Sequence, residues 1–463
     1  MTGPSSSSSI LHRDLRITPT IIDHAQGNYL YPQSTTTTTT TPGPDAIFDS
    51  VGGAAVISVG HNNTEVNAAI IAQLSQVAYI HSGDEFTTEI SERLGSYLVS
   101  AHSSKGGVER VYFANLGSEA NEAALKLCVQ YWFEKGHPGK NRFISRDMSY
   151  HGNCLGGMSL SGHVARRKPY EGMIDDARFH KVGPCFGFRY RKQGESSKEY
   201  TQRLVDELEE KIVEVGPENV AAFFAETVVG ATTGCVTATE GYFKGVRAVC
   251  DKYDVLLVLD EIMCGSGRTG TFFAWEQEGV VPDITTIGKA ISSGYSPLSC
   301  VVVSKKLIDG LSSGTSMFNC GHTFQSFALS CAAGYAVQQI VKRDNLLDNV
   351  AKMGKYLGQQ LLLKVGVIPI VVDVRGRGLF WGIEFGKKDE DNKPFDPELN
   401  VARRIGETCM KNGVVVYPGK GTIDGTVGDH IIISPSFTIT SEDIDHVVDV
   451  VSRSIVEFMD QNL

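Results

Sequence analysis

The sequence lacks the features that would place this protein in a membrane or on a nucleic acid. It contains no run of about 18 apolar residues, so no membrane-spanning helix is predicted. Its 43 lysines and arginines are outnumbered by 53 aspartates and glutamates, and a formal net charge of -10 argues against a nucleic-acid or anionic-membrane partner. The N-terminus has no apolar signal-peptide core. We therefore expect a cytoplasmic protein, with a mitochondrial presequence, suggested by Arg13 and Arg16 near serines, as the alternative.

Metal-binding cysteine patterns are also missing. The chain has ten cysteines, but it has no Cys-x-x-Cys pair and no Cys/His spacing typical of a zinc site. Most of them lie among apolar or small residues, as Cys128, Cys250, Cys300 and Cys331 do. We predict free, buried thiols in a reducing compartment, and no metal centre.

Strands and helices alternate through the middle of the chain, which at 463 residues is long enough for two domains. Short apolar runs predict strands, and amphipathic runs predict helices. The predicted strands are 111–114, 143–145, 220–225, 255–259, 284–287 and 300–304, and the predicted helices include 87–100, 119–133, 199–213, 241–253 and 326–342. This alternation predicts a mostly parallel α/β sheet covered on both faces, with ligands bound beyond the carboxyl ends of the strands.

The flanks of this region have a different character. Seven threonines at 35–41 predict a low-complexity surface loop, and Gly52-Gly53 predicts the bend of a strand–turn–strand over 46–57. Beyond residue 345 we predict a smaller α+β domain. Its expected helices are 345–364, 397–412 (N-cap Asp396) and 441–458 (N-cap Ser441), and its expected strands are 370–375, 379–385 and 414–417.

An acid and a lysine at two strand ends suggest the chemistry. Asp260 follows the apolar strand 255–259, and Lys289 follows the strand 284–287. Pyridoxal phosphate (PLP) requires a carboxylate at its pyridinium nitrogen and a lysine amine at its aldehyde carbon. Small residues around Lys289 leave room for a cofactor, and a freed amine there is suited to proton transfer. Taken singly, Asp260 is also consistent with a structural acid, and a lone lysine at the position of Lys289 is more often a solvated strand end.

Four further segments complete the pattern. Gly117 and Ser118 lie where a strand runs into a helix, which is a favourable place for a phosphate. Tyr150 follows a strand end and could stack on a flat ring or belong to the core. Glu226 lies at the end of another strand, where it is either an active-site acid or a structural acid. Thr323 precedes a predicted helix, either as its N-cap or as a phosphate ligand.

Taken in order along the chain, these segments resemble the class III pyridoxal-phosphate-dependent aminotransferases of fold type I. The resemblance covers roughly residues 25–458. It rests on NLGSEANEAALKL (115–127), YHG (150–152), AETVVGATTG (225–234), LDEIMCGSGRTG (259–270), PDITTIGK (282–289), GHTF (321–324) and RGRGLFWGIEF (375–385). No single segment is specific, but the ordered set is.

The resemblance implies a fold and a role for each site residue. It implies a large domain at 76–345 with a mostly parallel seven-stranded sheet, and a small α+β domain made by 346–463 together with the N-terminal segment 1–75. Lys289 resembles the lysine that binds the PLP aldehyde, and Asp260 resembles the pyridinium partner. The remaining residues resemble the stacking ring (Tyr150), the phosphate cup (Gly117 and Ser118), the acid at the ring edge (Glu226) and a threonine that reaches the neighbouring subunit's phosphate (Thr323). That last role implies a homodimer with shared active sites.

One departure from the family pattern bears on the substrate. Many family members carry an arginine before a Pro-Pro pair near the C-terminus, but this chain has no arginine between Lys411 and Phe437. The segment around Gly428–His430 resembles the branch that acts on ω-amino acids and amines. Lys420 is one substitute for the missing cation. Phe86 and Trp381 either line a pocket or pack in the core, and we favour the core for Trp381.

We therefore predict a ping-pong aminotransferase that moves an amino group between an amino acid or amine and a keto acid or aldehyde. A racemase, aminomutase or decarboxylase on the same scaffold is the alternative, because these enzymes share the lysine and the acid. A non-catalytic family member is a third reading, which the intact Lys289 and Asp260 disfavour.

Overall fold

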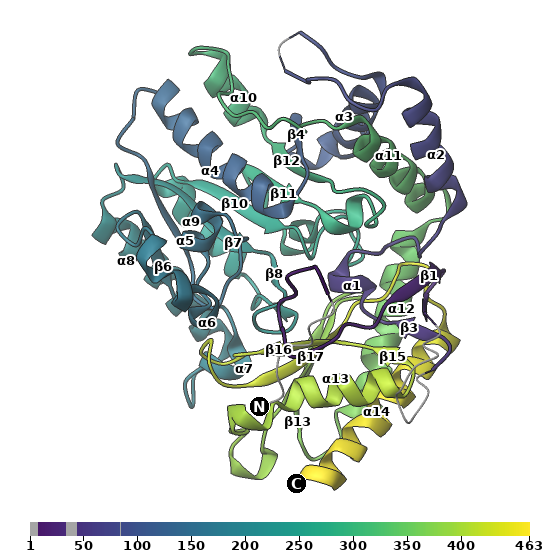
Figure 1. Ribbon diagram of the computed structural model, residues 1–463. Helices are drawn as coiled ribbons and strands as arrows, with labels where there is room; N and C mark the ends of the chain where they lie inside the picture. Colours follow the sequence, from purple (N-terminus) through teal and green to yellow (C-terminus); the bar gives the residue numbers. More distant parts are fainter. Residues whose placement is uncertain (1–7, 34–43, 84) are drawn as a thin grey trace.

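The structure is a computed structural model that describes residues 8–33, 44–83 and 85–463 (Figure 1). The threonine-rich loop predicted at 35–41 lies outside the described residues. Within the described ranges, no helix combines the length and the apolar character needed to cross a bilayer. All ten cysteines are free, and all except the half-buried Cys154 are buried, which confirms the prediction of free, buried thiols.

A seven-stranded sheet forms the centre of the molecule. Its order is β4 (Arg110–Ala114), β12 (Ser299–Val303), β11 (Ile284–Ile287), β10 (Leu256–Glu261), β7 (Val220–Glu226), β5 (Arg142–Arg146) and β6 (Phe179–Val182). The pairs β11–β10, β10–β7, β7–β5 and β5–β6 are parallel, whereas β12 is antiparallel to both of its neighbours. The predicted mostly parallel sheet is therefore confirmed, and five neighbouring strands direct their carboxyl ends to one edge.

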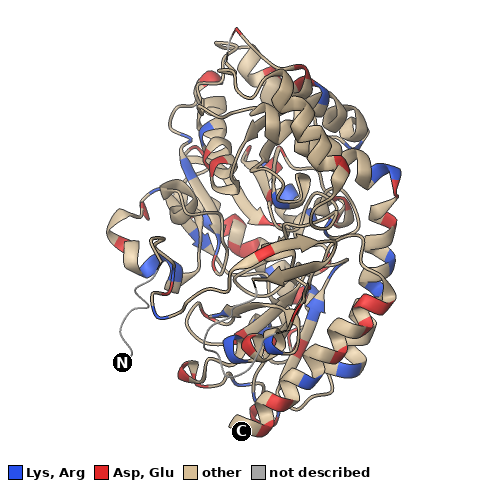
Figure 2. Ribbon diagram, turned by 45° about the vertical axis from the view of Figure 1, so that its right-hand side comes forward, with Lys and Arg blue, Asp and Glu red and all other residues tan. Residues whose placement is uncertain are grey.

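Helices cover both faces of this sheet, because its strands present apolar side chains in both directions. On one face α4 (Gly117–Glu134), α5 (Leu155–Leu160) and α10 (Lys305–Ser312) pack on alternate strand residues such as Phe224 and Val258. On the other face α3 (Glu89–His102), α8 (Ser197–Val215) and α9 (Tyr242–Lys252) pack on the intervening residues, such as Phe223 and Leu257. Lysine, arginine, aspartate and glutamate are interspersed over the helices and loops (Figure 2).

The C-terminal part builds a second sheet and a second core. The sheet has the order β13 (Val371–Gly376), β14 (Trp381–Phe385), β17 (Asp429–Ile433) and β16 (Tyr417–Lys420). Helices α11 (Ala328–Arg343), α12 (Leu346–Gln360), α13 (Val401–Lys411) and α14 (Ser441–Asn462) contribute to the adjoining core, and a π-helical turn (Leu361–Val365) follows α12. Trp381 packs against this core and donates from Nε1 to the Gly378 carbonyl at 2.7 Å, as we expected for a core residue.

The N-terminal residues join this part of the molecule through a third sheet. Its order is β1 (Ile22–Gln26), β2 (Tyr29–Pro32), β3 (Ile47–Asp49) and β15 (Val414–Val415), with β15 parallel to β3. Ser50 donates its hydroxyl to the Val415 carbonyl across 365 residues of sequence. Short α1 (Gly52–Ala55) and α2 (Thr64–Gln76) follow, and the side chain of Asn63 caps α2.

Several predicted boundaries are wrong. The second strand of 46–57 is absent, because Gly52 and Gly53 both have positive φ and turn the chain into the short α1. The helix predicted over 397–412 is broken at Asn400, whose left-handed backbone separates a 3-10 turn capped by Asp396 from α13. The N-cap of α14 is Thr440 and not Ser441, because Thr440 has the extended backbone and accepts from the Asp443 N–H.

The structure also contains elements that the sequence does not predict. They include the strands β6 and β17 and the helices α5, α6 (Val164–Arg167), α7 (Gly187–Tyr190) and α10.

A buried arginine links the central sheet to the other two. Arg268, in the loop after β10, is 0 % exposed, and its guanidinium lies 4.8 Å from the ring centre of Phe437. Among the described residues it donates only to backbone carbonyls, which belong to Ala55, Ile57, Leu379, Ser434 and Pro435. Because these carbonyls come from three separate stretches of chain, one side chain fixes their relative positions.

A pH effect on stability is expected from a histidine in the core. His102 is buried at the end of α3, and its ring is stacked on Phe272 with centroids 4.0 Å apart. Burial lowers the pKa of His102 from 6.5 to about 4. The unfolded chain therefore binds a proton that the folded chain excludes, so stability is lost as pH falls below 6.5. This histidine should cost about 2 kcal/mol of unfolding free energy by pH 5.

The measurement is urea unfolding of His102→Gln at pH 7.5 and pH 5. The variant should show a smaller loss of stability between the two pH values than the unaltered protein does. His137→Gln removes an exposed histidine and is the matched control, which should keep the full loss. If His102→Gln and the control lose the same unfolding free energy between pH 7.5 and pH 5, His102 is not the source of the pH effect.

Candidate active site

Three buried polar side chains lie in register at the carboxyl edge of the central sheet. Glu226 of β7 pairs with Asp260 of β10, and Asp260 pairs with Thr286 of β11. Residues that are opposite each other on neighbouring strands point to the same face of a sheet. Glu261, one position later, points to the other face, where it accepts from the Thr227 hydroxyl and from two backbone N–H groups. The sheet itself therefore brings Glu226 and Asp260 together.

Asp260 is held by three hydrogen-bond donors. Its Oδ2 accepts from Nδ2 of Asn121 and lies next to Nδ1 of His151, both at 2.8 Å. Its Oδ1 accepts from the backbone N–H of Ile262 at 3.0 Å. A carboxylate has about four acceptor sites, so one remains for a further donor. Asp260 is thus a fixed and almost fully buried anion that can still accept one hydrogen bond.

Asn121 connects Asp260 to the neighbouring strand. It lies on α4, is 2 % exposed, and also donates to the His151 carbonyl at 2.9 Å. Its Oδ1 accepts from the Thr286 hydroxyl at 2.8 Å. The amide therefore uses both its donor and its acceptor side, and it holds α4, β10 and β11 in a single arrangement around Asp260.

Lys289 lies two residues beyond the end of β11. Its backbone has a φ of +46°, which is strained for a residue other than glycine and is typical of functional positions. Burial lowers the pKa of the Lys289 amine, while the charges of Asp260 and Glu226 act in the opposite direction. Among the described residues, no hydrogen bond or ion pair engages its Nζ. The position therefore supplies an unengaged amine close to two acids.

The loop after β5 packs tightly on the beginning of α4. Ser118 Oγ accepts from the Asn153 N–H at 3.0 Å. Gly152 has a φ of +115°, and a Cβ there would lie 2.9 Å from the Ser118 Cα, so only glycine fits. The first N–H groups of a helix lack intrahelical acceptors. The beginning of α4 at Gly117 and Ser118 can therefore accept an anion, close to the loop that carries Tyr150 and His151.

Glu226 holds the Tyr150 loop in place. Its Oε1 accepts from the Tyr150 N–H and its Oε2 accepts from the Gly230 N–H, both at 3.0 Å. Burial raises the pKa of the Glu226 carboxyl, and Asp260 contributes in the same direction. The two backbone contacts fix the position of Tyr150, whose ring is half-buried at the edge of the site.

The other predicted residues lie elsewhere. Thr323 is exposed and does not cap a helix, because α11 begins only at Ala328 with Phe327 as its N-cap. Phe86 is 62 % exposed and so is not a core residue. Lys420 is directed away from the site, because its Nζ donates to the Pro397 carbonyl at 2.9 Å and to Asn400 Oδ1 at 3.1 Å. The suggested substitution by Lys420 for the missing arginine is therefore wrong.

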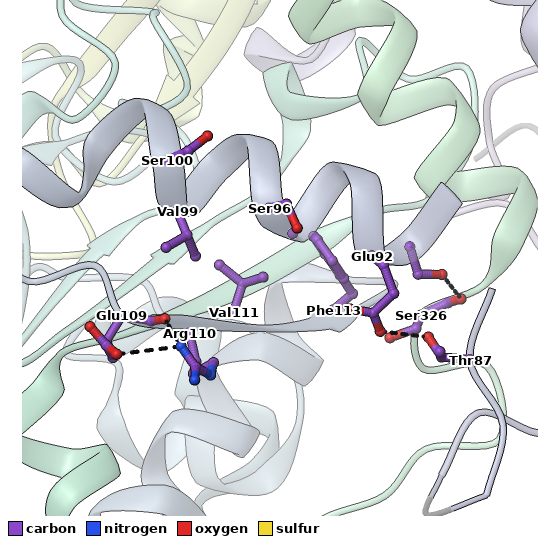
Figure 3. Close-up of a pocket in the computed structure, with 12 residues that line it drawn as sticks. Thr87, Glu92, Ser96, Val99, Ser100, Glu109, Arg110, Val111, Phe113 and Ser326 are labelled. Carbon is purple, nitrogen blue, oxygen red and sulfur yellow. Dashed lines mark hydrogen bonds and ion pairs between the residues drawn. The ribbon is translucent and has the colours of Figure 1, made fainter. Parts of the chain in front are cut away.

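A surface cavity of about 580 Å³ lies away from these residues, between α3 and the edge strand β4 (Figure 3). Its lining includes Glu92, Ser96 and Arg110, with Ser326 at one end. None of the predicted site residues lines it. This cavity is therefore separate from the residues that we predict for the active site.

Sequence reasoning missed Asn121, Thr286 and Arg166. Asn121 and Thr286 are in quoted segments, but their pairing becomes visible only when α4 packs on the sheet. Arg166 belongs to a short basic cluster, and its guanidinium lies 5.0 Å from the centre of the Tyr150 ring.

The site as a whole can bind a phosphorylated, cationic ring and move a proton near it. It combines an amine without a bound partner, a fixed buried carboxylate, a helix start that can accept an anion, and an aromatic ring.

The chain is similar to known proteins both in sequence and in structure. The family model described as aminotransferase class-III matches residues 16–455. An uncharacterized aminotransferase of Schizosaccharomyces pombe is 45% identical over 437 residues, covering 94% of this chain and 92% of that protein. An aminotransferase of Gibberella zeae is 41% identical, covering 97% of this chain and 90% of that protein. An amine transaminase of an uncultivated Pseudomonas species, solved in its PLP-bound form, superposes with a TM-score of 0.87 at 30% identity, covering 99% and 98% of the two chains.

Proposed function

The chain belongs to the class-III aminotransferase family, and from this membership we propose how its own residues share the work of the reaction. The protein is a PLP-dependent enzyme that transfers an amino group from an amino acid or amine to a keto acid or aldehyde in two half-reactions. Lys289 is the catalytic residue of our proposal, and Gly117, Ser118, Tyr150, Glu226, Asp260 and Thr323 complete the cofactor site. The main support for this assignment is the Lys289 amine, which has no hydrogen-bond partner among the described residues and lies near Asp260 and Glu226, two acids paired on neighbouring strands.

The residues present are suited to PLP. Asp260 keeps one free acceptor site for a pyridinium N–H, and the beginning of α4 can receive a phosphate. His151 Nε2 is buried without a partner among the described residues, so this side of Asp260 has unused hydrogen-bonding capacity. These features support Asp260, Gly117 and Ser118 as the groups that hold the two ends of the cofactor, with Tyr150 against the ring.

Each residue then has a physical task. When bound, PLP supplies an electron-withdrawing ring and an aldehyde that takes up the amino group. Asp260 keeps the ring nitrogen protonated, and the donors from Asn121 and His151 fix its orientation. Lys289, whose pKa burial lowers, can be an unprotonated amine near neutral pH, so it can take a proton from the substrate carbon and return it.

We assign the enzyme to the branch that acts on ω-amino acids and amines. The absence of an arginine between Lys411 and Phe437 supports this assignment, and so does the similarity to an amine transaminase. The test is a screen of amine and ω-amino acid donors with pyruvate or 2-oxoglutarate as acceptor. Amine transfer supports the proposal. Racemisation or carbon dioxide release without amine exchange would contradict it.

We further propose a cytoplasmic homodimer with shared active sites. Thr323 is exposed on the single chain, next to Phe324, which is 51 % exposed and lies 5.4 Å from Tyr79 between ring centroids. Exposed aromatic side chains of this kind are enriched at interfaces. A second copy seated on this surface would cover the aromatic pair and bring Thr323 to the partner's cofactor.

Phe324→Asp is expected to weaken the dimer, because a charge replaces an apolar side chain that the interface would bury. We expect the dissociation constant to rise by about tenfold or more in analytical ultracentrifugation, and specific activity to fall at low protein concentration. Leu362→Asp replaces an equally exposed residue after α12 and serves as the control. An unchanged dissociation constant in Phe324→Asp would exclude this surface as the interface.

A further inference from the structure

At the edge of the site lies an arginine that has no acidic partner among the described residues. The Arg166 side chain is exposed at the end of α6, with its guanidinium carbon 5.0 Å from the centre of the Tyr150 ring. Its neighbour in the sequence, Arg167, is bound to Asp176 at 2.5 Å. For Arg166, the one hydrogen bond found among the described residues is a long one, 3.4 Å from Nη2 to the Ala231 carbonyl. Most of its five N–H donors are therefore free for a ligand.

The segment that carries Arg166 is fixed by the C-terminal sheet. His163 Nε2 lies 3.3 Å from the Lys420 carbonyl, and a Cβ on Gly425 would lie 2.9 Å from the Val164 nitrogen. Tyr190 also donates its hydroxyl to the Ile423 carbonyl of the same β16–β17 loop. This loop lies within the segment that lacks the family's usual arginine. The fold therefore places a different arginine against it.

The charge of Arg166 acts on the reacting end of the site. Burial raises the pKa of Tyr150, and Arg166 gives the largest opposing contribution. Burial also lowers the pKa of Lys289, and Arg166 adds to that shift. Two other nearby cations do not offer a comparable group, because Arg268 is fully buried among carbonyls and Lys420 is bound to Pro397 and Asn400. Arg13 is exposed and also acts on Tyr150, so it is the competing candidate.

We propose that Arg166 binds the carboxylate of the substrate, so that the enzyme favours ω-amino acid donors and keto acid acceptors over amines and aldehydes without a carboxylate. The planar guanidinium matches a carboxylate with two parallel N–H···O bonds. While one edge of the guanidinium makes these bonds, its face can remain over Tyr150. The inference rests on the proposed function. It assigns to Arg166 the carboxylate binding for which the segment between Lys411 and Phe437 has no arginine.

The experiment compares 4-aminobutanoate with butylamine, two donors that differ only in the carboxylate, each with pyruvate at saturation. In Arg166→Gln we expect kcat/KM for 4-aminobutanoate to fall by about 10- to 100-fold, as for the loss of a hydrogen-bonded charge pair. With butylamine the half-reaction, followed by the absorbance of the holoenzyme, should change less than threefold. Arg166→Lys should recover part of the loss.

Binding of an unreactive carboxylate gives a second readout. Butanoate should bind the holoenzyme in calorimetry, and this binding should be lost in Arg166→Gln but retained in Arg167→Gln, the matched control with the same change of charge. Equal losses for both donors, or a loss in Arg13→Gln and not in Arg166→Gln, would overturn the proposal. Failure of the unaltered enzyme to transfer an amine from any donor would instead overturn the proposed function.

Discussion

Replacing Lys289 with alanine is expected to reduce kcat by about 10⁴-fold or more, the largest effect of any single substitution in this chain. Two tasks are lost together: the amine that binds the cofactor aldehyde and the base that moves the proton. No neighbouring lysine can take over, because the position depends on the end of β11 and on a left-handed backbone at residue 289. The reconstituted protein should also lose the absorbance band at roughly 410–430 nm that is typical of a lysine-bound cofactor.

A second buried lysine provides the control for this experiment. Lys140 is 7 % exposed and lies 4.0 Å from the Trp132 ring centre, away from the sheet's carboxyl edge. Lys140→Ala should change stability but keep both the absorbance band and kcat within a few-fold. A Lys289→Ala protein that retains the band, or that turns over at a tenth of the normal rate, would rule out the assignment of Lys289.

Replacing Asp260 with asparagine is expected to lower kcat by about 10²- to 10³-fold, the size of effect seen when one preorganised electrostatic contact is removed. The charge that keeps the ring nitrogen protonated is lost. In addition, the new NH₂ group must face either the Ile262 N–H or the donors from Asn121 and His151. Such a donor–donor contact in a buried site should cost about 1–3 kcal/mol of unfolding free energy.

The effect on kcat has to be separated from the effect on stability. Asp283→Asn is the matched variant, because Asp283 is a buried aspartate at the amino end of β11, where it accepts from Arg247 and from the Leu257 N–H, each at 2.8 Å. This variant should unfold more easily and yet keep its kcat. Steady-state kinetics at saturating PLP, together with urea unfolding of both variants, makes the comparison. Equal kcat losses in the two variants would argue that Asp260 acts only through stability.

Much of the sheet could be predicted because its signal is local. The apolar runs that end at Asp260 and at Ile287 are short, bounded and followed by polar residues, so both strands and both site residues could be named in advance. The direction of β12 could not, since an apolar run such as Ser299–Val303 has the same composition in either orientation. The choice between Thr440 and Ser441 as a helix cap likewise depended on the backbone and not on residue type, because both side chains can cap.

The contacts around Asp260 could not be predicted for a different reason. Asn121 is separated from Asp260 by 139 residues of sequence, and no periodicity reports a contact that exists only after α4 packs on β10. Arg166 was visible as part of a basic cluster, but its position over Tyr150 depends on the contact between α6 and the β16–β17 loop. Ordered short segments can therefore identify the chemistry, whereas the supporting contacts and the substrate-facing cation require the folded chain.

The pairing of β3 with β15 has a consequence for how the protein is made. Phe48 leaves the ribosome long before its partner Val414 has been synthesised. At translation rates of about 5–20 residues per second, the 365 residues between Ser50 and Val415 correspond to a wait of roughly 20–70 s. During that time the three N-terminal strands have an open edge beside the emerging chain. This edge can close only after residues 414 and 415 have been synthesised, so a nascent chain stalled before residue 414 should be a much better substrate for chaperones than the finished protein.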